Sequence, residues 1–274
     1  MWDQVVSSPY VKYGAVLSLT AGCLILVRKW IAGGTCKSKA RLDGKTALIT
    51  GANTGIGKET ARDLARRGAR VVMACRDLTR AENAAEEIQR TTGNGNVVIR
   101  HLNLASLYSV REFAKDFLAT EERLDILVNN AGKVDFDDMF FDKRPYNSLV
   151  SYKQSKLANV LFSRELARRM RGTGVTSYSL HPGVIRTELG RHVESWHPLL
   201  KTVLSLPCIL LMKTPWQGAQ TTIYCAVTEG LESKSGCYFS DCVERQPSPE
   251  GKDDEVARRL WEESARLVGL TKER

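Results

Sequence analysis

The sequence predicts an α/β fold built on a doubly wound parallel sheet, with an apolar helix ahead of it. Short apolar runs alternate with helical patterns from Leu42 to the last residues. A glycine-rich turn follows the first apolar run, and an uncharged segment lies near the N-terminus. Parallel strands need crossover connections, which are usually helices, so this alternation indicates βαβ units.

The composition is that of a folded globular protein. The 274 residues carry 40 Lys and Arg against 31 Asp and Glu, a net charge of +9, with 43% hydrophobic residues. These values exclude a disordered, collagen-like or polytopic membrane chain. The seven Cys form no CxxC pair, which argues against a disulfide scaffold and a zinc site, so we expect no metal. The basic residues are spread along helices, so the charge does not indicate nucleic-acid binding.

The N-terminal segment is a separate element. Residues 14–27 read GAVLSLTAGCLILV and are followed by Arg28 and Lys29. Fourteen residues fall short of the roughly 20 that span a bilayer, although residues 30–32 could extend them. The alternatives are a cleaved signal peptide, a buried or targeting helix, and a retained anchor, which we favour because the following domain has an intracellular character. We therefore divide the chain into an anchor (1–32), a flexible basic linker (33–41) and a Rossmann-fold domain (42–274).

The predicted strands are short apolar runs bounded by polar or turn residues. In chain order they cover residues 45–50 (KTALIT), 70–74 (RVVMA), 96–102, 124–129 (LDILVN), 175–180 and 236–240. The predicted helices repeat apolar residues every three or four positions. They cover residues 57–67, 81–90, 106–119, 151–171, 215–227 and 253–268, with Gly68 and Gly269 as stop signals for the first and last.

The turn after the first strand predicts a nucleotide site. It reads Gly51-Ala52-Asn53-Thr54-Gly55-Ile56-Gly57 and leads into a helix. Glycines let the backbone approach a pyrophosphate, which then lies at the positive helix N-terminus. The spacing is GxxxGxG instead of the usual GxGxxG. A tight turn without a ligand is the alternative.

The end of the second strand favours NADP over NAD. An acidic residue about 20 positions after the glycines would bind the ribose 2′-hydroxyl of NAD. Arg76 stands there instead, and a guanidinium suits a 2′-phosphate. Lys58 could add to it, and we interpret Asp77 as a helix N-cap.

A tyrosine and a lysine open the long helix over residues 151–171. Tyr152 and Lys156 are four positions apart and share a helix face. A neighbouring ammonium favours the phenolate and lowers the phenol pKa, so the pair can exchange a proton with a substrate oxygen. A YxxxK pair alone is weak, because Tyr–Lys pairs on helix surfaces are common.

Four motifs in order resemble the short-chain dehydrogenase/reductase family. They are the glycine turn (51–57), Asn-Asn-Ala-Gly (129–132), YxxxK (152–156) and His-Pro-Gly (181–183). The phrases SKLANVLFSRELARR, GVTSYSLHPGVIRTELGRH and EVARRLWEESARLVGL are similar to the membrane-anchored retinol dehydrogenases of that family, the last two to its mitochondrial type. The resemblance covers about residues 42–270.

The resemblance implies roles for individual residues. Tyr152 would be the proton donor or acceptor, and Lys156 would bind the nicotinamide ribose. Asn103 stands where the family usually has an Asp beside the adenine. The implied cofactor-binding residues are Gly51, Asn53, Thr54, Gly55, Ile56, Gly57, Arg76, Asn103, Asn129, Ala131, Gly132, Tyr152, Lys156, Pro182, Gly183 and Thr187.

The resemblance also implies a cofactor, a substrate and a location. We expect NADP, a lipophilic retinoid-like substrate, and retinol–retinal interconversion. We expect association with the mitochondrial inner membrane, with the endoplasmic reticulum membrane as the alternative, and a homodimer is an option.

The stretch between Gly132 and Tyr152 departs from the family. It has 19 residues, KVDFDDMFFDKRPYNSLVS, with neither a helical stripe nor a strand-like run. A βαβ crossover takes roughly 30 or more residues. We infer that a central strand and its crossover helix are missing, about 55–60 residues by comparison with the family. In the family this piece carries a catalytic Ser and Asn, and Ser148, Ser151 and Ser155 lie too close to Tyr152 to replace the Ser.

The deletion has a structural and a functional consequence. The strand predicted over residues 175–180 must either pair directly with the fourth strand or leave a gap. The alternative to an active enzyme is therefore a catalytically impaired, membrane-tethered chain that binds nucleotide or partners without turnover.

A second apolar stretch lies near the expected substrate side. Residues 199–212 read LLKTVLSLPCILLM, interrupted by Lys201 and Pro207. It is either a buried lid helix or a lid that also touches the bilayer. His192 and His197 lie near it without any metal-ligand spacing, so we expect surface or core positions for both.

Overall fold

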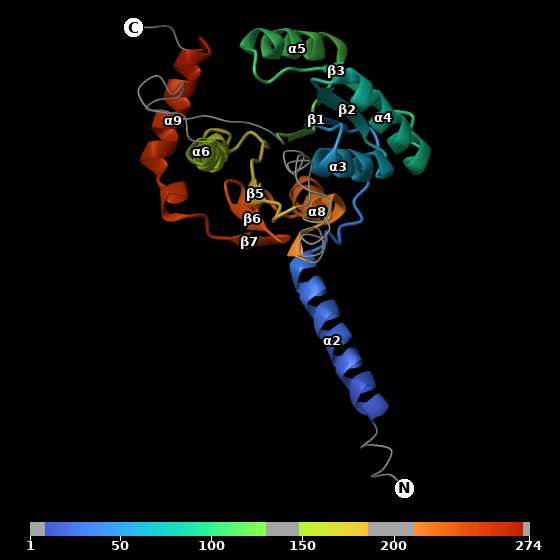
Figure 1. Ribbon diagram of the computed structural model, residues 1–274. Coiled ribbons are helices and arrows are strands. Elements are labelled where there is room, and N and C mark those ends of the chain that lie inside the picture. Colours follow the sequence, from blue (N-terminus) through green and yellow to red (C-terminus); the bar gives the residue numbers. More distant parts are fainter. Residues whose placement is uncertain (1–8, 130–147, 186–210, 271–274) are drawn as a thin grey trace.

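The computed structural model describes residues 9–129, 148–185 and 211–270 (Figure 1). Its strands are β1 (Thr46–Thr50), β2 (Arg70–Cys75), β3 (Val97–His101), β4 (Ile126–Val128), β5 (Ser179–His181), β6 (Tyr238–Ser240) and β7 (Val243–Arg245). Its helices are α2 (Pro9–Ala32), α3 (Gly55–Arg66), α4 (Leu78–Thr92), α5 (Leu107–Thr120), α6 (Ser148–Arg169), α8 (Pro215–Val227) and α9 (Asp254–Leu267), with the short 3-10 turns η2 (Glu232–Lys234) and η3 (Pro249–Lys252).

The helix boundaries follow local signals in the sequence. Asp77 caps α4 by accepting a hydrogen bond from the Arg80 N–H at 3.0 Å, which confirms its predicted role. Ser106 caps α5 in the same way. Gly68 follows α3 with a φ of +97°, a conformation that suits glycine and ends the helix. The helix predicted over residues 215–227 begins and ends at those residues, since Thr214 and Gln217 form a capping box.

The first sheet contains four parallel strands in the order β3-β2-β1-β4. Thr50 pairs with Ala74, and Cys75 with His101, so the strands end at one edge. Helices connect them, as expected for βαβ units. This arrangement confirms the parallel Rossmann-like half of the predicted fold.

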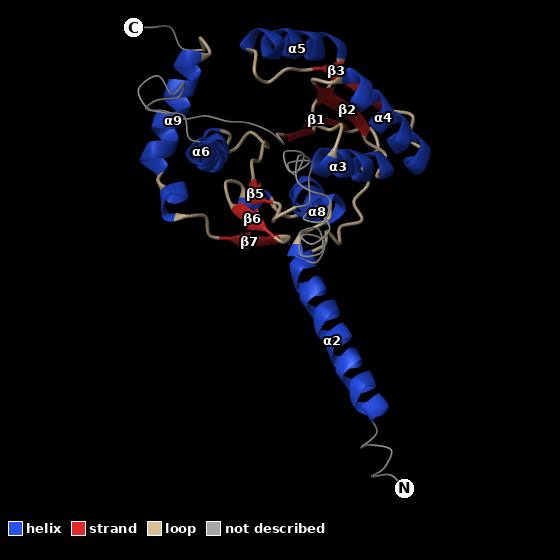
Figure 2. Ribbon diagram, viewed as in Figure 1, coloured by secondary structure: helices blue, strands red, loops and turns tan. Residues whose placement is uncertain are grey.

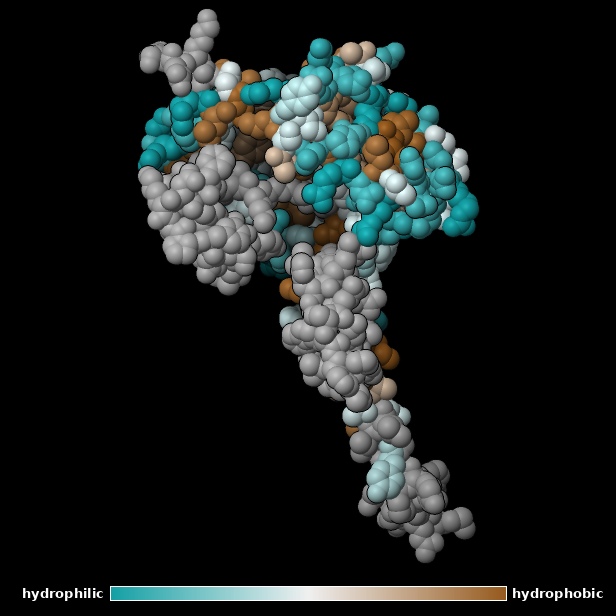
Figure 3. Space-filling model, turned by 45° about the horizontal axis from the view of Figure 1, so that its top comes forward, coloured by the Kyte–Doolittle hydropathy of each residue, from teal (hydrophilic) through white to brown (hydrophobic). Residues whose placement is uncertain are grey.

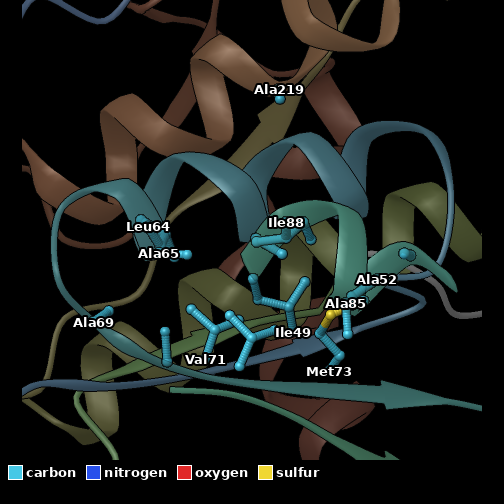
Figure 4. Packing of buried hydrophobic residues seen from close by; sticks show 14 of the residues in the cluster. Ile49, Ala52, Leu64, Ala65, Ala69, Val71, Met73, Ala85, Ile88 and Ala219 are labelled. Carbon is cyan, nitrogen blue, oxygen red and sulfur yellow. The ribbon is translucent and has the colours of Figure 1, made fainter. Parts of the chain in front are cut away.

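Alternate residues of this sheet enter two different cores. Ile49, Val71 and Met73 point toward the helices on one face (Figure 4). They share a core there with Leu64 of α3 and Ile88 of α4. α8 completes this core with apolar side chains from Ala219 to Val227. The other face is covered by α5, whose Phe117 packs on a smaller cluster with Leu48, Val72, Ala74 and Leu102. The period of two along each strand therefore produces a doubly wound sheet.

Within the described residues, β4 is the last strand of the first sheet. β5 pairs in parallel with β6, and β6 pairs antiparallel with β7, in a second sheet (Figure 2). Of the two predicted arrangements, direct pairing of β4 with β5 is not found among the described strands. β4 has three residues, and Leu127 at its centre is 52% exposed, whereas all five residues of β1 are buried. The strand prediction over 175–180 was too early, because β5 begins at Ser179.

α6 belongs to the second half of the molecule and packs against α9. Phe162 stacks on Trp261 with ring centroids 5.3 Å apart, and Arg169 lies 4.8 Å from the same ring. Ala158, Leu161, Ala257 and Leu260 form the apolar contact between the helices. The Arg164 guanidinium pairs with Asp254 at the start of α9.

The segment over residues 33–41 is attached to the body, so the expectation of a flexible linker was wrong. The Cys36 N–H donates to Gln220 on α8, and the Ser38 hydroxyl donates to the Val227 carbonyl. Arg67 binds the carbonyls of Ser38 and Ala40 at 2.9 and 3.0 Å. α2 extends away from the body beyond this segment (Figure 1). Among the helices described, none combines the length and apolarity that a bilayer crossing requires.

A buried carboxylate joins three elements of the first sheet. Glu121 follows α5, its side chain is 3% exposed, and it accepts hydrogen bonds from Arg70 on β2 and Arg100 on β3. The hydrogen bonds from Arg70 hold the pKa of Glu121 below its usual range, so the carboxylate remains ionised.

We predict that Glu121→Gln lowers the free energy of unfolding by about 1.5–3 kcal/mol at pH 7, because it removes charge-assisted hydrogen bonds. Chemical denaturation of the full chain measures this loss. A lowered folded-state pKa stabilises the fold fully above the unfolded value of about 4.3, and this stabilisation disappears as the pH falls through the folded value. The difference between wild type and variant should therefore shrink below about pH 4. Glu122→Gln, at the exposed next position, is the control; equal losses in both variants would contradict the assignment.

Candidate functional site

Four polar or glycine positions gather at the carboxyl edge of the first sheet. Gly51 follows β1, Arg76 follows β2, Asn103 lies two residues beyond β3, and Asn129 follows β4. The parallel registers bring these strand ends together. In open α/β sheets, ligands bind outside this edge.

The glycine turn is fixed to the sheet by its backbone. The Gly51 N–H donates to the Ala74 carbonyl at 2.9 Å, so the ladder between β1 and β2 continues one residue beyond β1. Gly51 has a φ of +62° and Gly55 one of +58°, where a Cβ would be strained. The backbone of Ala52 and Asn53 hydrogen-bonds the buried Cys75 thiol, whose pKa is raised by burial. The turn is therefore held from beneath by a neutral sulfur.

The start of α3 is the candidate site for an anion. Thr54 stands at the N-cap, and its side chain makes no capping hydrogen bond. The first amide groups of the helix are thus left for a ligand, and the helix dipole favours negative charge there. Gly57 is buried in the first turn. Because the turn has no bulky side chain at Gly51 or Gly55, its geometry fits a dinucleotide pyrophosphate.

Arg76 and Lys58 have different environments. Arg76 is exposed just beyond β2 at the same edge. Lys58 is engaged elsewhere, because its Nζ lies 2.6 Å from Glu87 on α4. Lys58 thus joins α3 to α4, and its part in binding a 2′-phosphate stays a prediction. Asn103 accepts a hydrogen bond from the Ala105 N–H, and its own N–H donates to Ser109.

α6 carries the predicted proton-transfer pair. Tyr152 and Lys156 are in its first turns, four residues apart on one face; the Tyr152 side chain is outside the described atoms. Lys156 lines a large cleft that it shares with the glycine turn, and partial burial of its ammonium group lowers its pKa. The pKa of His181 is lowered by burial and further by the charges of Lys213 and Lys156. The end of β5 and α6 therefore face a common space.

The segment after β5 forms another wall. Pro182 and Gly183 line the cleft together with Val184 and Ile185. Gly183 has a φ of +89°, and a Cβ there would lie 2.8 Å from two carbons of the Lys213 side chain. Of the predicted site residues, Ala131, Gly132 and Thr187 lie outside the described residues, as do His192, His197 and most of the segment over 199–212.

A cleft of about 2300 Å³ joins these parts. It is lined by the glycine turn, the open side of β4 with Asn129, α6 from Lys156, and the segment after β5. Figure 3 shows apolar surface inside the hollowed part of the molecule, bordered by hydrophilic surface. The cleft thus combines a polar edge at the glycine turn with apolar walls.

α8 contributes residues that the sequence reasoning missed. A Cβ on Gly218 would lie 2.3 Å from Ile185 and 3.5 Å from Ile56 of the glycine turn. This glycine lets α8 approach both the glycine turn and the segment after β5. Its position inside a predicted helix was the available signal, since glycine there is unfavourable without a packing reason.

Comparisons of the sequence and of the structure with known proteins indicate the same family. The family model described as short chain dehydrogenase matches residues 45–144. Retinol dehydrogenase 13 of Homo sapiens is 42% identical over 96% of this chain and 96% of that protein. Retinol dehydrogenase 12 of Bos taurus is 43% identical over 89% and 92%. A crystal structure of an uncharacterised protein from Mycobacterium paratuberculosis is 27% identical and superposes with a TM-score of 0.66, covering 86% of this chain and 98% of that one.

The alignment with the human relative also contains positions that this chain does not fill. It extends over 318 positions, although the chain supplies only 96% of its 274 residues, so about 55 positions are filled in the relative alone. This number is close to the roughly 55–60 residues that the sequence predicts to be missing after Gly132. The chain belongs to the short-chain dehydrogenase/reductase family of oxidoreductases.

Proposed function

We propose that the chain is an NADP(H)-dependent oxidoreductase of the retinol dehydrogenase type, acting on a lipophilic alcohol or carbonyl such as retinol or retinal. The observation that carries this proposal is the common cleft, which has the uncapped start of α3 on one side and Lys156 on the other. The apolar walls of the cleft and the retinol dehydrogenase relatives support the substrate class.

The proposed chemistry assigns one task to each part of the site. The bound nicotinamide supplies or accepts the hydride. Tyr152 donates a proton to the substrate oxygen during reduction and takes it back during oxidation. The Lys156 ammonium group favours the phenolate form and so lowers the barrier to this transfer. The amides at the start of α3 hold the pyrophosphate.

The preference for NADP rests on the edge beyond β2. Arg76 is exposed there, and Asp77, the next residue, is occupied as the cap of α4. A guanidinium binds a phosphate through two parallel hydrogen bonds, whereas an acidic residue would repel it.

We predict that Arg76→Ala weakens NADPH binding about 10-fold or more while changing NADH binding less than about 2-fold, because only NADPH carries the 2′-phosphate. Fluorescence titration of the full chain with each nucleotide measures both affinities. Arg66→Ala, at the other end of α3, is the control for the loss of one positive charge. Equal weakening of both nucleotides by Arg76→Ala would contradict the proposed contact.

A second candidate is nucleotide binding without turnover. The exposed β4 and the roughly 55 positions found in the relative alone favour it, because the family's catalytic Ser and Asn are expected within the missing piece. The carboxyl edge of the first sheet is built from the ends of β1, β2, β3 and β4 and does not include that piece.

Steady-state NADPH oxidation with retinal separates the two candidates. For the leading proposal we predict measurable turnover in the wild-type chain and a loss of about 100-fold or more in Tyr152→Phe, since the variant removes the proton donor. NADPH binding should survive in the variant. Binding without turnover in the wild type selects the second candidate, and the absence of both contradicts the two proposals together.

We also propose that α2 attaches the chain to a membrane surface. Leu24, Ile25, Leu26 and Val27 are between 45% and 67% exposed, and Trp30 is 84% exposed. The exposed Lys29 follows at the end nearer the body, and a basic side chain beside an apolar segment is attracted to anionic lipid headgroups.

We predict that Leu26→Asp reduces binding to anionic vesicles about 10-fold or more, because it replaces an apolar group that would enter the lipid. Co-sedimentation of the full chain with phosphatidylserine vesicles measures the change. Leu118→Asp, on α5 and 80% exposed, is the matched control. Equal binding of wild type and Leu26→Asp would exclude α2 as the contact.

A further inference from the structure

Lys213 is the most deeply buried cation among the described residues that lie outside the proposed reaction. It precedes the N-cap of α8, and its side chain is 8% exposed. Its ammonium group pairs with the Asp241 carboxylate in the turn between β6 and β7. A lysine is rarely buried to this extent unless it is paired.

The same lysine supports the wall formed by the segment after β5. The Lys213 N–H donates to the Val184 carbonyl at 2.8 Å, and Ile185 pairs with Lys213 as a parallel bridge. The aliphatic part of the lysine passes directly beneath Gly183, where no Cβ would fit. The backbone of this wall therefore lies on the stem of one side chain.

The Asp241 end of the pair contacts the exit of α2. A Cβ on Gly33 would lie 2.0 Å from the Asp241 carboxylate and 2.6 Å from the Lys213 Nζ. A Cβ on Gly34 would lie 1.9 Å from the Asp241 carbonyl. Arg28 near the end of α2 also donates to the Met212 carbonyl at 2.8 Å. Figure 1 shows α2 meeting the body beside α8 and β7.

We propose that Lys213 is a positioning residue that couples the exit of α2 to the cleft wall at Gly183, through its ion pair with Asp241. The ammonium group of Lys213 lies against Gly33, which follows α2, and its aliphatic carbons lie against Gly183 of the wall. A displacement of Gly33 moves the carboxylate, the carboxylate moves the ammonium group, and the stem shifts beneath Gly183. This inference rests on the proposed function, because the wall is the expected nicotinamide side of the cleft.

Two variants break the coupling from opposite ends. Lys213→Met retains most of the stem and removes the charge. Gly33→Ala inserts a methyl group between the carboxylate and the ammonium group, at a distance from any expected nucleotide contact. We expect each variant to weaken NADPH binding about 5-fold to 10-fold, and the double variant to weaken it no further, because both break the same link.

Each variant has a matched control. Gly44→Ala carries the same backbone strain, with a φ of +73° against +70° at Gly33, but a Cβ there meets nothing within 4 Å. Lys234→Met removes a lysine that pairs with Glu244 at 2.8 Å on the exposed side of the same sheet. Both controls should bind NADPH as the wild type does. Affinities of Gly33→Ala and Lys213→Met within about 2-fold of the wild type would overturn the inference.

Amide hydrogen exchange tests the coupling without any nucleotide. Exchange of the backbone N–H of residue 213, which donates to the Val184 carbonyl of the wall, should be about 10-fold faster in Gly33→Ala and Lys213→Met than in Gly44→Ala. If the wild type fails to bind NADPH, the proposed function fails, and this measurement still decides on the coupling. Asp241→Asn, whose side chain is 41% exposed, replaces Lys213→Met if that variant does not fold. Unchanged exchange in both Gly33→Ala and the variant used at the ion pair would contradict the role of Lys213.

Discussion

The candidate site at the carboxyl edge of the first sheet depends on the parallel pairing of β1 with β2. The register places the ends of both strands side by side. The hydrogen bond from the Gly51 N–H to the Ala74 carbonyl extends the ladder into the glycine turn. α3 can then begin with its amide groups directed at the edge where Arg76 lies. Every element that this geometry needs is present and covered, on one face by α3, α4 and α8 and on the other by α5. Strands β1, β2 and β3 and the helices that cover them therefore form this part of the fold without β5.

The part of the molecule that contains α6 and β5 is positioned by different contacts. α6 packs on α9 through Phe162 and Trp261, and β5 pairs with β6 instead of β4. The interrupted sheet cannot align the two halves by hydrogen bonds between β4 and β5. α8 takes over much of this task, because Gly218 lets it contact Ile56 and Ile185 together. The distance between the cofactor edge and Lys156 thus depends on side-chain packing more than on a continuous backbone ladder.

The sequence predicted those parts of the fold that local patterns determine. Strand and helix periodicity located the elements of the first sheet, and the cap at Asp77 follows from side-chain chemistry alone. The missing strand and crossover helix remain a prediction, which rests on 19 residues being fewer than a crossover takes. The choice between a gap and direct pairing was not predictable, since it depends on the competition of β4 and β6 for β5 across long sequence separations. Lys213 was missed because a single lysine in a chain with 40 basic residues carries no pattern.

The attached segment over residues 33–41 illustrates the same limit. Its Gly-Gly pair reads as a flexible linker, yet the glycines are required for close contact with Asp241. Glycine signals either freedom or tight packing, and only the tertiary structure distinguishes the two.

The most direct test of this account is amide hydrogen exchange of the full-length chain with and without saturating NADPH. Binding at the strand ends predicts slower exchange over residues 51–58 and 74–78, with a smaller effect over residues 182–185. Residues 254–267 of α9, far from the cofactor edge in the chain's second half, should exchange unchanged. Equal rates with and without NADPH over residues 51–58 would contradict the claim that this half of the molecule binds the dinucleotide without the missing strand.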